Sequence, residues 1–275
     1  MKRSIFFLCS ILSGLAGLAQ TLPETLQFAD AEYRSAQYAL AASAYQRALY
    51  FGSDSIGPYC LRQLAGCYEG LQDWDRANQY LEKIYYVGWN DSLQASLLLE
   101  KSANLLHARN FTSARQELLK IRINTRNTQW KELQVYRGMT CFGLGDYPAS
   151  EQYFLGAVAG DSLRTREVSQ LFVLNRKADR LHPGLARALS LVLPGLGQVY
   201  AGDWKDGINS LLLNAAFAGL FYNTVVELSL FDATVSVFPW FLRYYAGGSK
   251  RAGAIALQKR NARHAAVFNS LVNLL

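Results

Sequence analysis

The chain has 275 residues, enough for about two domains, and 18% of its residues are charged while 51% are apolar. The positive charge is uneven, because residues 1–160 have a net charge of +1 and residues 161–275 a net charge of +6. The basic part also holds the most apolar stretches, which favours membrane lipids as its partner and disfavours nucleic acid, whose binding would need basic residues on a soluble face.

Residues 1–20 have the pattern of a signal peptide. Lys2 and Arg3 precede an apolar stretch, and Gly17-Leu18-Ala19 places small residues where a signal peptidase reads them. We expect cleavage after residue 19 or 20 and export into a bacterial-type envelope. An uncleaved anchor helix is the alternative.

Three cysteines follow this segment, and they are expected to pack in the core. Cys60 and Cys67 lie seven residues apart on one predicted helix, about 10 Å along its axis, which is too far for a disulfide. With Cys141 the count is odd and no CxxC pair occurs, so neither a zinc site nor a disulfide framework is predicted.

A motif recurs four times over residues 21–160, with copies about 36 residues apart. Each copy has an aromatic residue, a small residue three positions later, and apolar residues four and seven positions after the small one. The aromatic residues are Tyr38, Trp74, Phe111 and Tyr147, and the small residues are Ala41, Ala77, Ala114 and Ser150. The apolar residues are Tyr45, Leu81, Leu118 and Phe154, and then Ala48, Ile84, Ile121 and Ala157. The period predicts stacked helical hairpins, with the aromatic residues in the core.

This pattern resembles the tetratricopeptide repeat family, most closely around Ala65, Tyr68 and Trp74 and around Gly145-Asp146-Tyr147. The resemblance covers about half of the chain. It implies a right-handed superhelix whose concave groove takes peptides or helices from partner proteins. Polar positions of the first helices supply the candidate groove residues: Arg62, Gln63, Glu69, Asn104, His107 and Arg137.

Residues 161–183 predict a capping or linker helix after the last repeat, because a solenoid end needs a lid with a polar outer face. His182-Pro183-Gly184 then breaks the chain. We place the domain boundary there, so that residues 184–275 form a second domain.

A dense Pro-Gly motif opens this second domain and predicts a broken helix. It resembles the Pro-Gly-x-Gly-Gln-x-Tyr-x-Gly signature of small bacterial membrane domains of unknown function, which implies an architecture and no chemistry. Gln198 and Tyr200 are expected to satisfy the carbonyls that Pro194 frees. A phosphate-binding loop is disfavoured, because no third glycine and no Lys-Ser/Thr pair follow. The candidate residues are Pro194, Gly195, Gly197, Gln198, Tyr200, Gly202, Lys205 and Gly207.

Two membrane spans are predicted, over residues 207–226 and 233–248, followed by a basic amphipathic helix. If residues 185–201 also cross, the basic tail reaches the cytoplasm, as the positive-inside rule requires, and we favour this arrangement. The expected fold is all-α: a tetratricopeptide-like solenoid followed by a small transmembrane helical domain with two to three segments.

No catalytic motif occurs, and His107, His182 and His264 lack the spacing of metal ligands, so we expect no enzyme, no metal and no other cofactor. The expected function is a membrane-anchored scaffold of the inner membrane, whose periplasmic repeats bind a partner protein or peptide. The alternative is a membrane-embedded accessory factor for lipid binding, insertion or transport, in which the repeats only recruit.

Overall fold

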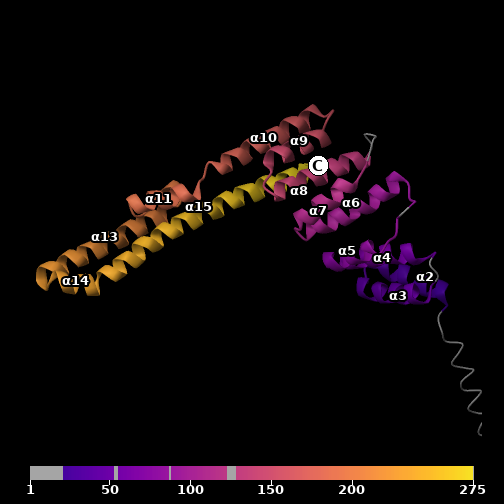
Figure 1. Cartoon of the computed structure of the whole chain (residues 1–275), viewed down its shortest axis with the longest axis horizontal. Coiled ribbons are helices and arrows are strands. Elements are labelled where there is room, and N and C mark those ends of the chain that lie inside the picture. Colours follow the sequence, from indigo (N-terminus) through magenta and orange to yellow (C-terminus); the bar gives the residue numbers. More distant parts are fainter. Residues whose placement is uncertain (1–20, 53–54, 87, 123–127, 275) are drawn as a thin grey trace, which may run out of the picture. The chain divides into compact units, whose positions relative to one another are not determined.

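The computed structural model describes residues 21–52, 55–86, 88–122 and 128–274 (Figure 1). The predicted signal peptide lies outside these residues. Within them the fold is all-α, as predicted, and contains no strand. The chain divides into two compact units, Met1–Ala157 and Val158–Leu275.

Four helical hairpins make up the first unit. In each hairpin the two helices pack against one another, and consecutive hairpins are also in contact. They are α2 (Leu22–Arg34) with α3 (Tyr38–Phe51), α4 (Gly57–Gly70) with α5 (Trp74–Glu82), α6 (Asp91–His107) with α7 (Phe111–Lys120), and α8 (Thr128–Gly143) with α9 (Tyr147–Ala157). Each copy of the sequence motif therefore starts the second helix of a hairpin.

The turn inside each hairpin repeats one backbone geometry. Its central residue has a positive φ, and the N–H of the following residue donates to the carbonyl five positions back, for example from Asp73 to Tyr68 at 2.8 Å. In three hairpins that following residue also caps the next helix, as Asp73 does by accepting from the Arg76 N–H at 3.1 Å. The central residues are Ala36 (60°), Gln72 (59°), Arg109 (56°) and Gly145 (80°).

The apolar positions of the motif form the core of this unit, which confirms the prediction. The small residues let the two backbones of a hairpin approach closely, and the large ones fill the space between hairpins. The exposed fraction is 0% for Ala41, Ala77, Ala114 and Ser150, and at most 1% for Tyr45, Leu81, Leu118 and Phe154.

Two cysteines belong to the same core. Cys60 and Cys67 are buried and free, as predicted, while Cys141 is free and half-buried. Burial raises the pKa of the Cys67 thiol to about 11, which makes it unreactive at neutral pH.

The second unit is organised around one long helix, α15 (Phe238–Leu274), which packs against every other helix of the unit (Figure 1). The others are α10 (Ser162–Asp179), α11 (Pro183–Val192), α12 (Leu196–Tyr200), α13 (Trp204–Glu227) and α14 (Leu230–Ser236). The helix predicted over residues 161–183 is thus present as α10, and it lies along α15.

The helix boundaries near the C-terminus differ from the prediction. The expected span over residues 233–248 and the basic helix after it are not separate elements, because α14 ends at Ser236 and α15 continues through both regions. Pro239 lies in the first turn of α15, where a missing N–H costs no hydrogen bond. Gly248 does not break the helix either; it lets α15 approach α13, since a Cβ there would lie 3.0 Å from the Ser210 hydroxyl.

Among the helices of the described ranges, none combines the length and the apolar character that crossing a bilayer requires. This finding counts against the predicted spans over residues 207–226 and 233–248 and against a crossing by residues 185–201. The sequence reason is visible in α13, where Asn209, Asn214 and Asn223 interrupt the apolar run.

Candidate functional site

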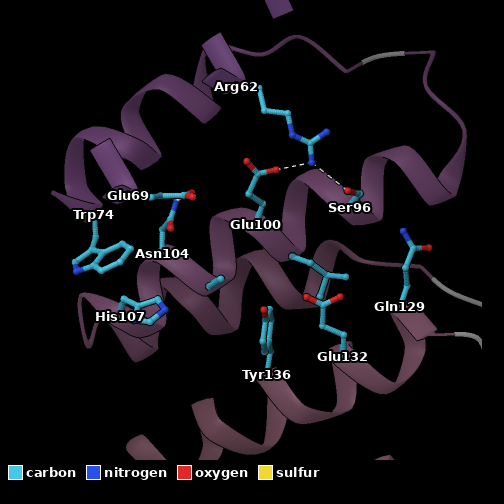
Figure 2. Close-up of a pocket in the computed structure, with 12 residues that line it drawn as sticks. Arg62, Glu69, Trp74, Ser96, Glu100, Asn104, His107, Gln129, Glu132 and Tyr136 are labelled. Atoms are coloured by element: carbon cyan, nitrogen blue, oxygen red, sulfur yellow. Dashed lines mark hydrogen bonds and ion pairs between the residues drawn. The ribbon is translucent and has the colours of Figure 1, made fainter. Parts of the chain in front are cut away.

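A cavity of about 470 Å³ lies between α4, α6 and α8, the first helices of three successive hairpins (Figure 2). Four of the six candidate groove residues line it: Arg62, Glu69, Asn104 and His107. The sequence reasoning did not select the other polar and aromatic residues that line it, which are Trp74, Ser96, Gln129, Glu100, Glu132 and Tyr136. We call this cavity the groove.

Much of the lining comes from one stripe of positions that recurs from hairpin to hairpin. On α6 the stripe consists of Ser96, Glu100, Ala103 and His107, which follow one another at helical spacing and all line the groove. Its equivalents on α8 include Glu132 and Tyr136. Aligning the repeats on their turns shows from the sequence that these positions are equivalent, and the structure shows that they face the groove on α6 and α8.

Polar side chains join α4 to α6 across the groove (Figure 2). The Arg62 guanidinium lies 2.5 Å from a carboxylate oxygen of Glu100 and donates a hydrogen bond to the Ser96 hydroxyl at 3.2 Å. Deeper in, the buried amide of Asn104 donates to a Glu69 carboxylate oxygen at 2.8 Å. These contacts fix the side chains that face the open space.

The four aromatic residues of the motif, Tyr38, Trp74, Phe111 and Tyr147, are all half-buried, and Trp74 forms a wall of the groove. The Trp74 ring stacks on His107, with 4.3 Å between ring centroids and 14° between planes. In neighbouring hairpins the equivalent rings pack on glycine, where a Cβ on Gly70 or Gly143 would lie 2.4 Å from the ring. His107 stands where the second and fourth repeats have Gly70 and Gly143, so the Trp74 ring stacks on an imidazole and its indole reaches the groove. The core position predicted for Trp74 is therefore wrong.

The groove carries an excess of negative charge. Of the described residues that line it, Glu69, Glu100 and Glu132 carry carboxylates, and Arg62 alone carries a permanent positive charge. Burial raises the pKa of Glu100, Arg62 opposes this, and Glu69 adds to it. Burial also raises the pKa of Tyr136, which hydrogen-bonds Glu132. The carboxylates therefore affect one another within one partly dehydrated space.

Two of the candidate groove residues lie elsewhere. Arg137 donates to the Leu118 carbonyl at 3.1 Å, and its guanidinium lies 6.0 Å from the centre of the Tyr153 ring. It therefore fastens α8 to the helices around it. Gln63 is half-buried on α4 and does not line the groove.

The Pro-Gly motif breaks the chain between α11 and α12, as predicted. Gly195 has a φ of 94°, and a Cβ on it would lie 2.1 Å from the Gly207 carbonyl oxygen. A Cβ on Gly197 would lie 1.8 Å from the Ala186 carbonyl oxygen. These glycines are required because the backbones of α11, α12 and α13 touch at this point.

The polar residues of the motif bind other helices, and the role expected for them is wrong. Gln198 is 1% exposed, accepts from the Ser190 hydroxyl at 2.8 Å and donates to the Gly248 carbonyl at 3.1 Å. Tyr200 donates to the Arg180 carbonyl at 3.0 Å. The carbonyl of Leu191, at the end of α11, accepts a hydrogen bond from Tyr245 of α15. Gln198 and Tyr200 therefore do not have the role that was predicted for them.

Gly202 and Lys205 lie just before α13 and in its first turn. The Gly202 carbonyl accepts from the Lys259 ammonium at 2.9 Å. Exposed Lys205 lies over the Trp204 ring, 5.8 Å from its centre. The motif therefore holds α11, α12, α13 and α15 together, and we call this region the joint.

Beyond the joint, the second unit exposes many large apolar side chains. Between Asp206 and Arg243 the sequence has two charged residues, Glu227 and Asp232. An apolar surface of this extent marks contact with a membrane or with another protein. The exposed apolar residues are Ile208, Leu211, Leu212, Leu220, Tyr222, Val226, Leu228, Leu230, Phe231, Val235, Trp240 and Leu242.

No protein-family model matches this chain, and no curated protein matches it significantly.

Proposed function

We propose that this protein is a scaffold of the bacterial envelope, in which the groove of the first unit binds a partner protein or peptide and the second unit holds the chain at a membrane. The observation that carries the proposal is the groove itself. It is lined by the first helices of three successive hairpins, on two of them at equivalent positions, and by polar side chains that are already held in place. Such prepositioning lowers the entropic cost of binding.

The resemblance to tetratricopeptide repeats supports the same function. The four hairpins, the recurring turn and the buried small residues agree with that resemblance, and the family uses the concave face of its first helices for peptides. The groove lies on first helices here as well.

Membrane attachment is supported by the apolar surface of α13, α14 and the start of α15. A bilayer would cover these side chains without any helix having to cross it. The predicted signal peptide favours the periplasm for the first unit and the inner membrane for the second. The exposed basic residues of α15, among them Lys250 and Arg263, suit the phosphate groups at a lipid surface.

Photo-cross-linking in cells tests the scaffold. A benzophenone amino acid replaces Gln129 in the groove of the full-length chain, and in a control chain it replaces Glu82, which is exposed on α5 and outside the groove. We expect a discrete adduct from the groove position alone, and its loss when Trp74→Ala and His107→Ala are combined with the probe. An adduct that forms equally from both positions, or that survives the double substitution, contradicts the proposal.

The alternative, a membrane-embedded accessory factor, is favoured by the size of the exposed apolar surface. Phe231 on α14 is 75% exposed, so Phe231→Asn leaves the packing of the unit unchanged. If this substitution abolishes the cellular role while the groove substitutions leave it intact, the membrane activity is primary and the repeats only recruit.

A further inference from the structure

The groove is lined by more negative than positive side chains, and this excess indicates what kind of segment it binds. We propose that it receives a partner segment through a Lys or Arg side chain, whose cation lies among the carboxylates of Glu69, Glu100 and Glu132. This inference rests on the groove being the binding site proposed above. It adds the chemistry of the partner, which the resemblance to a repeat family does not specify.

The repeats themselves provide an internal comparison. When the repeats are aligned on their turns, the position of Glu100 is occupied by Gln63 in α4, outside the groove, and by Tyr136 in α8. The position of Glu132 is occupied by Tyr59 and Ser96. Because neutral residues occupy the equivalent positions in the neighbouring hairpins, packing of the hairpins does not require a carboxylate at either position.

The carboxylates have acceptor capacity left for a ligand. Glu69 accepts from Asn104 at 2.8 Å, and Glu100 is paired with Arg62 at 2.5 Å. An ionised carboxylate offers about four acceptor positions, so each can take further N–H donors. A second cation beside Glu100 would relieve the repulsion from Glu69 and the cost of its burial, both of which disfavour its charged form.

The aromatic walls suit the rest of such a side chain. Trp74 and His107 present a stacked pair of rings to the groove, and Tyr136 lies beside Glu132 in Figure 2. Rings of this kind pack against the aliphatic stem of Lys or Arg and attract its cation. Acid groups and aromatic rings thus line the same cavity of about 470 Å³.

Three matched peptides test the inference. A fluorescein-labelled Gly-Ser peptide carries two arginines and two leucines at its centre; a second has citrulline in place of arginine, and a third has glutamate. Fluorescence anisotropy with the full-length protein in detergent measures their binding. We expect the arginine peptide to bind at least about tenfold more tightly than the citrulline peptide, and its affinity to fall as salt is added.

Substitutions in the groove make the test specific. Glu100→Gln and Glu132→Gln should each weaken binding of the arginine peptide by about tenfold, since each removes a charge-assisted hydrogen bond. Glu82→Gln, at an exposed carboxylate outside the groove, should leave it unchanged. Thermal unfolding followed by circular dichroism shows whether each variant keeps its fold.

The outcomes separate this inference from the proposed function. Equal binding of the arginine and citrulline peptides, or tighter binding of the glutamate peptide, overturns the cation preference while the groove remains a binding site. Failure of all three peptides to bind overturns the cation preference. If the groove cross-link is then also absent or insensitive to Trp74→Ala with His107→Ala, the proposed function fails with it.

Discussion

Glycine and other small residues have different structural roles in the two units. In the first unit, small residues recur at about the same spacing, and each serves a hairpin closed by a local turn. In the second unit, Gly195 and Gly197 serve one joint, and its polar bonds reach α15 across long stretches of sequence, as from Gln198 to Gly248. Stability in the first unit is therefore repeated and local, whereas in the second it depends on contacts between α15 and helices distant from it in sequence.

The largest expected effect comes from removing a core ring in the repeats. Phe154 is 0% exposed, so Phe154→Ala leaves a cavity and should lower the free energy of unfolding by about 3–5 kcal/mol. Denaturant unfolding followed by circular dichroism measures the loss. Tyr50→Ala, at a side chain that is 81% exposed, is the control and should change little. Comparable losses for the two variants would mean that the repeat core is not organised as described.

Next in size is the joint of the second unit. Gly197→Ala would place a Cβ against the Ala186 carbonyl oxygen and should cost about 3 kcal/mol. The matched control is Gly219→Ala on α13, where a Cβ meets nothing within 4 Å and better helix propensity should add about 0.5–1 kcal/mol. Unfolding in detergent, followed by tryptophan fluorescence, compares the pair. If both substitutions act with the same sign, close approach at the joint is not what requires glycine.

Substitutions in the recurring turn should change the free energy of unfolding by less, and with opposite signs at Gly145 and at Gln72. Gly145→Ala forces a Cβ into a turn with a φ of 80° and should cost about 1 kcal/mol, while Gln72→Gly at a φ of 59° should gain about 0.5 kcal/mol. Thermal unfolding of the two variants checks the signs. A lower stability of the Gln72→Gly variant would show that the Gln72 side chain makes a contact whose stabilising effect exceeds the cost of the positive φ.

The smallest expected effect is a pH dependence that arises in the groove. Burial raises the folded-state pKa of Glu100 above its ordinary value, so the folded state holds this proton more tightly than the unfolded state does. Its contribution is therefore present below the ordinary pKa of 4.5 and is lost as the pH rises through the folded-state pKa. Glu100→Gln should remove this slope, as unfolding measured between pH 4 and pH 7 would show. An unchanged slope would mean that Glu100 is not desolvated.

Local pattern is what made the first unit predictable. The turn, the cap and the apolar positions around Trp74, Phe111 and Tyr147 each depend on residues fewer than ten positions apart. Aligned copies of a repeat display such local rules several times over. The groove residues were only partly predicted, because choosing Glu100 and Glu132 requires knowing which face of α6 and α8 remains open.

By itself the sequence determined the all-α class, the four hairpins with their buried small residues, and the break at Pro194, since all of these follow from hydrogen bonding and burial within short segments. Only the tertiary structure decided that Trp74 stacks on His107 at the groove, that Gln198 bonds to Gly248, and that one helix continues from Phe238 to Leu274. Each of these depends on a neighbour distant in sequence or on the packing around it. Burial and hydrogen bonding at such a contact are decided by which helices meet, and no short-range pattern encodes that meeting.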